Sequence, residues 1–363
     1  MDRSVRCGDV VDEQRRANVI GLGLIGGSIG LALREAGWSV GGDDIDPEHL
    51  VDAVDRGCLD EPTLLLDAEV TFVAVPVLAV ADQVKRALAE TDGIVTDVGG
   101  VKGAITAAVD DPRFVGGHPM AGSELDGLDG ADGGMFNGAV WVLTPVAGTD
   151  DGAFASVASV VAQLGAEVVA MAPDRHDELV AVVSHVPHLA AASLIGVAAD
   201  KAEEHVALLR LAAGGFRDMT RVASRQPDIW LDICAENRPA IVAALDALIA
   251  GLAEMREIVG SDARAQLHDR LQRARVMRTN LPSRVTHPEE LAEVRIPIPD
   301  RTGAAAEVFT LAAELGVNIA SFEVVHSIEG RGVAVVLVDA AAAQLYRGGL
   351  IARGFRPAVH ALA

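Results

Sequence analysis

Cysteine is scarce in this sequence. Cys7, Cys58 and Cys234 are its three cysteines, and they lie far apart with no CxxC pair or Cys/His cluster. This spacing argues against a disulfide framework and against a structural zinc site, so we predict no metal. It fits a protein of the reducing cytoplasm.

Positive charge is scarce as well. The 30 Lys+Arg residues stand against 52 Asp+Glu residues, which gives a net charge of −22. The attraction that usually brings proteins to nucleic acid or to an anionic lipid surface is therefore missing, and we expect neither partner.

Long apolar runs are also lacking. The longest, residues 70–81 and 189–199, are shorter than the roughly 18 residues that a membrane span needs. Residues 1–17 are polar, lack the apolar core of a secretory signal and are expected to form a flexible tail. We therefore expect a cytoplasmic protein with no membrane segment.

What is present is typical of a folded protein of two or three domains, since 50% of the 363 residues are hydrophobic and 23% are charged. From residue 18 to residue 172, short apolar runs alternate with stretches of helical period. This alternation indicates βαβ units and predicts an α/β domain with a parallel sheet covered by helices on both faces.

The strand signals stop after Pro173, and residues 173–280 are predicted to be helical and rich in Ala and Leu. Such helices need partners on several faces, so we expect this all-α domain to form a homodimer. Residues 281–291 are a polar linker that contains proline. Residues 292–363 follow in the order strand, helix, strand, strand, helix, strand, which is the βαββαβ ferredoxin-like plan.

A glycine-rich turn follows the first predicted strand and opens a predicted helix. In this context a GxGxxG match indicates a Rossmann-like dinucleotide site. Gly21 would allow the tight turn, Gly23 would let the pyrophosphate approach the backbone, and Gly26 would let the helix pack close to the strand. The predicted cofactor-binding residues here are Gly21, Leu22, Gly23, Leu24, Ile25, Gly26 and Pro76.

A carboxylate after the second predicted strand indicates which dinucleotide binds. Asp44 lies 23 residues after Gly21, near the offset at which an acidic residue accepts a hydrogen bond from the ribose 2′-OH. A carboxylate there repels the 2′-phosphate of NADP, and no arginine follows until Arg56, so we predict NAD. Asp43 and Asp46 compete for the same role, or are solvated turn residues.

His118 follows a predicted strand, at the strand end where open α/β sheets bind ligands. A neutral imidazole, with a reference pKa of about 6.5, can take a proton from an alcohol while a hydride leaves the same carbon. A hydrogen-bonded core histidine is the alternative interpretation.

Ser184 and His188 lie four residues apart, with Pro187 expected in the first turn of a helix. This spacing places both side chains on one helix face, where they could hold a polar group. Alternatively, Ser184 is a helix N-cap and His188 only fills space.

Two arginines follow a glycine pair, Gly214 and Gly215, that is expected to be a flexible joint. A dianionic substrate would be repelled by the strongly negative domain unless local cations received it, and arginine binds carboxylates bidentately. Arg221 is the predicted carboxylate clamp. A surface salt bridge is the alternative for Arg221 and for Arg217.

These motifs together resemble the prephenate dehydrogenase family, whose members oxidatively decarboxylate prephenate to 4-hydroxyphenylpyruvate on the way to tyrosine. The resemblance covers about residues 18–260. It rests on segments that occur in the family's order and spacing: GLGLIGGSIGLAL, DVGGVKG, VGGHPMAGSE, VVSHVPHLAA, GGFRDMTRVA and DIWLDICAEN.

The resemblance implies that His118 accepts a hydrogen bond from the substrate's ring hydroxyl and assists hydride transfer to NAD. It implies that Ser184 joins His118 as a catalytic residue, that Arg221 binds a carboxylate and that the helical region forms a homodimer. Asp218 and Glu124 resemble the acidic residues that pair with arginines at the site entrance. The implied substrate-binding residues are His188, Gly214, Arg221, Trp230 and Glu124.

Residues 292–363 are similar to an ACT domain, a module that commonly binds amino acids for feedback control. The resemblance implies that tyrosine is the effector. The implied regulatory residues are Asp300, Gly303, Asn318 and Ile319.

One position departs from the family pattern. Gly100, in DVGGVKG, stands where many members carry a serine that reaches toward the substrate and the nicotinamide. We therefore leave Gly100 out of the catalytic set and expect a water or another hydroxyl in that place. Two alternatives stay open: an arogenate dehydrogenase, and a non-catalytic sensor of NAD and an amino acid.

Overall fold

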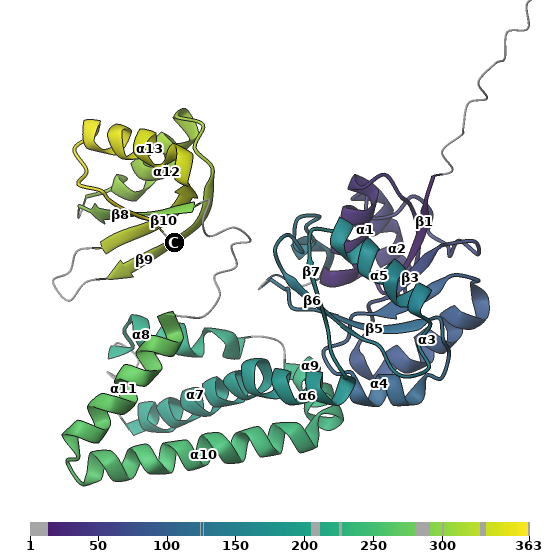
Figure 1. Cartoon of the computed structure of the whole chain (residues 1–363), viewed down its shortest axis with the longest axis horizontal. Coiled ribbons are helices and arrows are strands. Elements are labelled where there is room, and N and C mark those ends of the chain that lie inside the picture. The colour runs from purple at the N-terminus through teal and green to yellow at the C-terminus, as the bar shows by residue number, and fades with distance from the viewer. Residues whose placement is uncertain are drawn as a thin grey trace, which may run out of the picture. The chain divides into compact units, whose positions relative to one another are not determined.

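The computed structural model describes residues 14–123, 125, 127–204, 211–224, 227–279, 291–299, 301–326 and 332–361. The chain divides into two compact units, Met1–Asp269 and Arg270–Ala363 (Figure 1). The first unit contains a seven-stranded sheet with its helices and then a run of helices. The second unit contains a four-stranded sheet.

The large sheet has the strand order β2-β1-β3-β4-β5-β6-β7. Neighbouring strands are parallel except β5 and β6, which are antiparallel. The strands are β1 (Arg16–Ile20), β2 (Ser39–Asp43), β3 (Val70–Val73), β4 (Ile94–Asp97), β5 (Phe114–Pro119), β6 (Val140–Thr144) and β7 (Glu167–Ala170).

The α/β prediction for this part of the chain is confirmed, but its expectation of a purely parallel sheet is wrong. Parallel neighbours need a long crossover, usually a helix. In the described part of the segment between β5 and β6, the one helical element is the short 3₁₀ turn η1 (Gly127–Gly130). The chain returns to the sheet there in the antiparallel direction.

Strand β1 begins at Arg16, so two residues that were expected in the flexible tail belong to the sheet. Arg16 pairs with Ser39 in the register of β1 with β2, and its guanidinium bonds the Asp67 carboxylate. A charged residue at the start of a buried strand gives no apolar signal, which is why the sequence did not reveal it.

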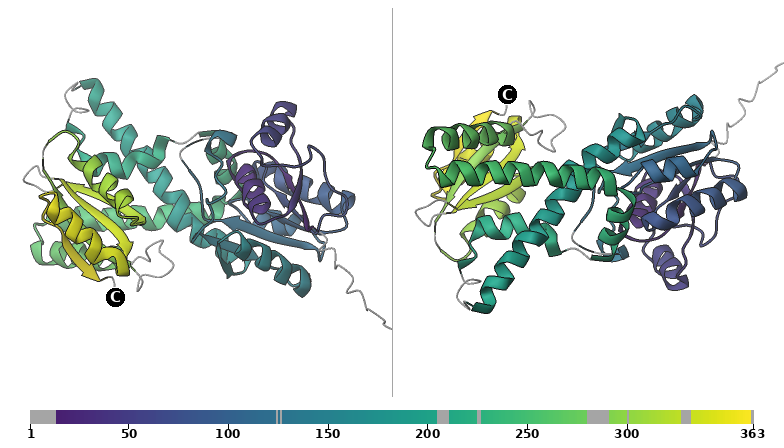
Figure 2. Two further views of the ribbon diagram at one scale, coloured as in Figure 1. Left: turned by 90° about the horizontal axis from the view of Figure 1, so that it is seen from above. Right: turned by 90° about the horizontal axis from the view of Figure 1, so that it is seen from below.

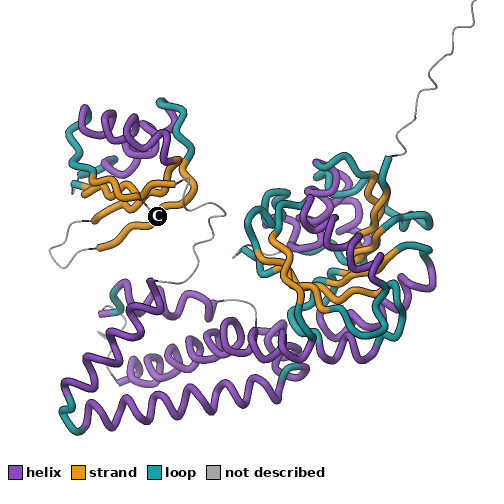
Figure 3. The backbone as a smooth tube through the Cα atoms, in the orientation of Figure 1, coloured by secondary structure: helices purple, strands orange, loops and turns teal. Residues whose placement is uncertain are grey.

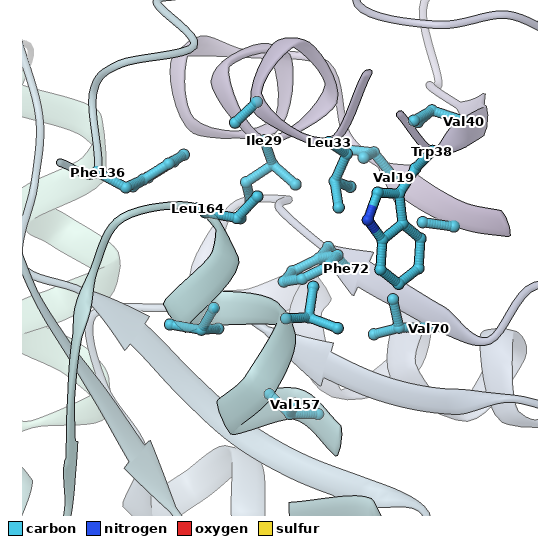
Figure 4. Packing of buried hydrophobic residues seen from close by; sticks show 14 of the residues in the cluster. Val19, Ile29, Leu33, Trp38, Val40, Val70, Phe72, Phe136, Val157 and Leu164 are labelled. Atoms are coloured by element: carbon cyan, nitrogen blue, oxygen red, sulfur yellow. The ribbon is translucent and has the colours of Figure 1, made fainter. Parts of the chain in front are cut away.

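Helices cover both faces of this sheet (Figure 1). Apolar residues of β1 and β3, such as Val19 and Phe72, pack against Ile29 and Leu33 of α1 (Figure 4). A second core lies where α3 and α4 meet the sheet. The helices are α1 (Leu24–Glu35), α2 (Pro47–Asp55), α3 (Val77–Glu90), α4 (Gly103–Ala108) and α5 (Asp151–Gln163).

The strand order creates a switch point beside β1. The chain leaves β1 for β2 on one side and later reaches β3 on the other side. Open α/β sheets bind ligands outside the carboxyl ends of strands at such a point. The residues that follow these ends are Gly21 after β1 and the segment through Pro76 after β3.

The chain from Pro173 onward is helical in its described residues up to Thr279, as predicted (Figure 2). The elements are α6 (Pro173–Val180), the π-helical turn η2 (Ala181–His185), α7 (Val186–Glu204), α8 (Gly214–Thr220), the 3₁₀ turn η4 (Arg221–Ser224), α9 (Pro227–Glu236), α10 (Arg238–Gly260) and α11 (Arg264–Thr279).

The expectation that a helix begins near Ser184 is wrong. The helix already runs from Pro173 and continues through η2 into α7. Pro187 has no backbone N–H and its ring clashes with the carbonyl four residues earlier, so an ordinary α-helical turn is disfavoured there. The wider π turn just before Pro187 accommodates it.

This continuous helix also changes the count of long apolar segments. Residues Pro173–Ala202 form a 30-residue helix whose most apolar window has a mean hydropathy of 1.7, enough by length and composition to cross a membrane. The expectation that no segment reaches this length therefore needs correction. A core or interface helix of a soluble protein passes the same test, so the finding is weak evidence for a membrane span.

The second unit has the βαββαβ order that the sequence predicted, with both helices on one face of an antiparallel sheet (Figure 3). The sheet order is β11-β8-β10-β9. Tyr346 lies in its core and donates a hydrogen bond to the Val308 carbonyl, and burial raises the pKa of Tyr346 to about 12. The elements are β8 (Leu291–Ile298), α12 (Ala304–Glu314), β9 (Ile319–His326), β10 (Gly332–Asp339), α13 (Ala340–Ala352) and β11 (Ala358–Ala361).

Candidate active site

The loop between β1 and α1 has the geometry of a pyrophosphate-binding turn. Gly21 has a φ of +90°, and a Cβ there would lie 2.5 Å from the Ala74 carbonyl oxygen. A Cβ on Gly26 would collide with the Gly21 carbonyl, so glycine keeps α1 close to the strand. At Gly23 a Cβ would meet no atom within 4 Å, and no side chain caps α1. The first N–H groups of α1 are therefore open to an anion.

Asp44 lies against this loop. Its carboxylate accepts hydrogen bonds from the N–H groups of Leu22 (2.6 Å) and Asp46 (2.9 Å), and its side chain is only 9% exposed. Asp43 instead forms an ion pair with Arg86, and the Asp46 carboxylate caps α2. Of the three candidates, Asp44 is the one whose carboxylate bonds the glycine loop.

The remaining loop residues lie at the same strand ends. Leu22 is buried, whereas Leu24 and Ile25 are half-buried at the start of α1. Pro76 is exposed and is the N-cap residue of α3, after β3. The predicted cofactor residues are therefore brought to one edge of the sheet.

His118 is half-buried near the carboxyl end of β5. Because β5 is parallel to β4, β3 and β1, this end lies on the same sheet edge as the glycine loop. The His118 Nδ1 lies 2.8 Å from the Nε2 of His176 on α6. Burial, helped by electrostatic interactions with His176, Lys102 and His185, holds the pKa of His118 well below its ordinary value. The ring is therefore neutral at neutral pH.

His176 is in turn bound by a carboxylate. Its Nδ1 lies 2.8 Å from Oδ1 of Asp177. The same oxygen accepts a hydrogen bond from the Lys102 N–H, and Oδ2 accepts one from the Gly103 N–H. Burial opposes ionisation, but these hydrogen bonds hold the pKa of Asp177 below its ordinary value. Asp177 thus ties α6 to the start of α4.

A fully buried ion pair, Asp97 with Lys102, lies next to the His118 strand. The Lys102 Nζ also donates to the Gly117 carbonyl at 2.7 Å, and the Asp97 carboxylate accepts from the N–H groups of Gly99 and Gly117. Burial lowers the pKa of Lys102, and the Asp97 charge opposes this shift. The pair fixes the backbone that leads into His118.

Two predicted substrate residues contact each other. The Trp230 ring stacks on His188 with centroids 3.6 Å apart, and the His185 ring lies edge-on to the same indole. Asn237 Nδ2 donates to the Asp177 carbonyl and lies 3.3 Å from His185 Nδ1. Burial lowers the pKa of His185 to about 4. A chain of contacts therefore runs from Trp230 back to Asp177.

Three other predicted residues lie in the same helical region. Ser184 is half-buried in η2, where no side chain caps a helix, so the N-cap alternative is wrong. Gly214 begins α8 and Arg221 begins η4, a turn that contacts α7, and both residues are exposed. The segment after Gly214 is thus helical rather than the flexible joint that we expected.

The remaining predicted residues divide into two groups. Glu124 and Asp300 lie outside the described residues. In the second unit, Gly303 caps α12 with a φ of +84°, Asn318 is exposed, and Ile319 begins β9. Within the described ranges, no group of three or more His, Cys, Asp or Glu side chains is arranged to hold a metal ion.

Gly100 faces the imidazole. A Cβ at this position would lie 3.7 Å from the Nε2 of His118, which is an ordinary contact. Gly100 does not have a positive φ, so its backbone accepts any side chain. The site therefore has space for the serine that the resemblance led us to expect.

Sequence reasoning missed His176, Asp177 and Asn237 as part of the site. Their only local signal is an adjacent histidine and aspartate, His176 and Asp177, in the first turns of a helix. His176 is 58 residues away from His118 along the chain, and no pattern in the sequence joins the two.

Comparisons with known proteins identify the family. The profile described as "Prephenate dehydrogenase, nucleotide-binding domain" matches residues 29–170, and the one described as "Prephenate dehydrogenase, dimerization domain" matches residues 172–273. The chain is 31% identical over 325 residues to the prephenate dehydrogenase of Bacillus subtilis (strain 168), a match that covers 85% of this chain and 88% of that protein.

Two crystal structures are also similar. Prephenate dehydrogenase from A. aeolicus, in complex with hydroxyphenyl propionate and NAD+, gives a TM-score of 0.70 at 30% identity and covers 74% of this chain and 99% of its own. Synechocystis arogenate dehydrogenase gives 0.65 at 30% identity and covers 73% and 99%. The Bacillus match covers more of this chain than the part that precedes β8, so it continues into the second unit.

Proposed function

The chain belongs to the prephenate dehydrogenase family and is an NAD-dependent oxidoreductase, and from this premise we propose that it oxidatively decarboxylates prephenate to 4-hydroxyphenylpyruvate, on the way to tyrosine. One observation carries the proposal. The neutral His118 imidazole lies on the sheet edge of the glycine loop, with its Nε2 toward the open position at Gly100.

We propose that NAD binds at the switch point between β1 and β3. The loop Gly21–Gly26 and the N-terminus of α1 receive the pyrophosphate, and Pro76 lines the site. The Asp44 carboxylate, which now accepts from the Leu22 N–H, accepts from the ribose hydroxyl. When bound, NAD supplies the hydride acceptor.

The reaction balances with no net proton. A hydride leaves the ring carbon that bears the hydroxyl, and the hydroxyl proton passes to Nε2 of His118. The bond to the ring carboxylate breaks, carbon dioxide leaves, and the bond's electron pair completes the aromatic ring. The phenolate oxygen then takes the proton back from His118. General-base help of this kind is worth about 10²–10⁴ in rate, and correct orientation of the ring carbon contributes further.

The helical region supplies the proposed substrate pocket. Arg221 binds a substrate carboxylate, because its guanidinium is the cation that the dianion needs inside a strongly acidic chain. Ser184 hydrogen-bonds the substrate beside His118. The proposed contacts with the rest of the substrate come from His188, Gly214, Trp230 and Glu124. The stacked rings of Trp230 and His188 support a pocket wall there.

We propose that residues 173–280 mediate a homodimer in the cytoplasm. Helices α7 and α10 expose large apolar side chains that water solvates poorly, among them Val197, Ile249, Leu252 and Val259. A second copy would cover them, which also accounts for the long apolar helix Pro173–Ala202 without a membrane.

We propose that residues 292–363 are an ACT-like regulatory domain that binds an amino acid, with tyrosine as the effector. The βαββαβ order and the extension of the Bacillus match into this unit support it. The proposed regulatory residues are Asp300, Gly303, Asn318 and Ile319.

An arogenate dehydrogenase is the second candidate, because an arogenate dehydrogenase is among the similar crystal structures. The test of both substrate hypotheses is NADH formation, followed by absorbance. Prephenate and arogenate are assayed in parallel, each with and without tyrosine. Faster turnover of arogenate would overturn the choice of substrate. No NADH with either would favour the sensor alternative.

His118→Asn tests the role of the imidazole. We expect kcat to fall by about 10²–10⁴-fold, since the proton acceptor is lost, while the dissociation constant for NAD stays unchanged. His360→Asn, at an exposed position in β11, is the control. An unimpaired kcat in His118→Asn would remove His118 from the mechanism.

A further inference from the structure

We infer that His176 and Asp177 are positioning residues that fix the tautomer and orientation of His118, so that its Nε2 is the proton acceptor. This inference rests on the proposed function of His118. Its physical basis is a continuous hydrogen-bonded chain from a carboxylate to the imidazole, with both links at 2.8 Å.

The direction of each hydrogen bond follows from Asp177. An ionised carboxylate can only accept, so His176 Nδ1 carries the proton and donates it to Asp177. When Nδ1 carries the single proton of the His176 ring, the other nitrogen, Nε2, is an acceptor. His118 Nδ1 must therefore donate to it, which leaves the His118 Nε2 without a proton.

Asp177 is well placed to begin this chain. Hydrogen bonds from the backbone N–H groups of Lys102 and Gly103, each 2.8 Å long, stabilise its charged form. Its neighbour His176 is only 1% exposed, so water cannot replace the carboxylate as the partner of Nδ1. These contacts hold both side chains in one arrangement.

The opposite side of His118 offers no such control. Gly100 has no side chain, and a Cβ at this position would lie 3.7 Å from the His118 Nε2. A serine there would place a hydroxyl against the acceptor nitrogen. In this chain the imidazole is therefore fixed from its Nδ1 side by His176.

The same contacts join two segments of the first unit. His176 and Asp177 lie on α6, whereas His118 lies on β5 and the N–H groups of Lys102 and Gly103 lie just before and at the start of α4. The packing of α6 against the sheet therefore also sets the tautomer of His118. The group that positions the proton acceptor comes from the helix that leads into Ser184 and His188.

The test compares variants of His176. His176→Leu removes the acceptor at Nε2, and we expect kcat to fall by about 10²–10⁴-fold, because a histidine that loses its orienting partner works poorly as a base, with the NAD dissociation constant within about twofold. His176→Gln returns an amide oxygen near the former Nε2 and should recover most of kcat. Glu178→Gln, exposed on the same helix, is the matched control and should change neither value.

A spectroscopic readout separates positioning from folding. In the full-length protein with ¹⁵N-labelled histidine, the His118 ring should show a protonated Nδ1 and an unprotonated Nε2 at neutral pH, without substrate. In His176→Leu the two tautomers should mix. A protonated Nε2 in the unsubstituted protein, or an unchanged tautomer and kcat in His176→Leu, would overturn the inference.

A second variant distinguishes the loss of His118 positioning from a folding defect. Asp177→Asn keeps the shape, so its thermal unfolding and its His118 ring signals can be measured together, with Asp174→Asn on the exposed start of α6 as control. We expect the tautomer to change in Asp177→Asn only. Because the ring spectrum needs no substrate, a protein inactive on prephenate but with the expected tautomer would refute the proposed function and leave only the assignment of the tautomer to His176 and Asp177 standing.

Discussion

Replacing Lys102 by methionine tests how much the site depends on the buried Asp97–Lys102 pair. Methionine has a similar length and no charge, so it leaves the Asp97 carboxylate fully buried with two backbone N–H donors and no cation. Breaking a buried ion pair by removing one partner costs about 3–5 kcal/mol. For a unit of this size, that loss lowers Tm by roughly 6–20 °C.

The assay is thermal unfolding followed by circular dichroism, with kcat measured below the transition. We expect kcat to fall as well, because Lys102 holds the Gly117 carbonyl next to His118. Arg175→Met is the control. Its ion pair with Glu178 is 61% exposed on both sides, so its loss costs at most about 1 kcal/mol.

A double variant sharpens the test. Asp97→Asn with Lys102→Met removes both charges, so it should be more stable than Lys102→Met alone, since no unpaired charge remains buried. If Lys102→Met unfolds no earlier than Arg175→Met, or if the two changes simply add, the reasoning from burial is refuted.

Three further outcomes are expected. Arg221→Ala should raise KM for prephenate by tenfold or more and change kcat little, because it removes carboxylate binding in the ground state. Gly100→Ser should fold with a Tm within a few degrees of the unsubstituted protein and change kcat less than tenfold, because its Cβ fits 3.7 Å from the His118 Nε2. The free energy of unfolding should fall as pH drops from about 6.5 toward 4. In this range the imidazoles of the unfolded chain bind protons, whereas in the folded state His185, with its pKa of about 4, and His118 stay unprotonated.

Each of these has its own control. Arg217→Ala, at an exposed arginine whose guanidinium bonds the Ala212 carbonyl, should leave KM unchanged. Gly117→Ser should destabilise the protein strongly, because its Cβ would lie 2.6 Å from the Asp97 carbonyl oxygen. His185→Gln should flatten the pH dependence of stability. An equal KM in both arginine variants, an unfolded Gly100→Ser, or a pH profile that rises toward pH 4 would contradict the respective argument.

The sequence was informative wherever a short stretch of chain determines the structure. The alternation of apolar runs and helical periods predicted the α/β domain, the helical region and the βαββαβ order, because periodicity reports which face of an element is buried. The glycine spacing predicted the turn after β1, since the positive φ of Gly21 and the close approach of Gly26 to the Gly21 carbonyl both lie within six residues. The strand before His118 was expected to end at Val115, but β5 continues to Pro119 and includes His118, which pairs with Val142 of β6.

The tertiary structure decided what depends on contacts between distant segments. The sequence favoured Asp44 by its offset from Gly21 and left Asp43 and Asp46 as competitors, and only the packing of β2 beside the glycine loop brings the Asp44 carboxylate against the Leu22 N–H. Likewise, only the folded sheet shows that β6 pairs with β5 in the antiparallel direction. The link from His118 to His176 exists because α6 docks against the sheet. The spacing of residues along the chain does not predict such docking, because docking arises only when the whole chain buries its apolar surface.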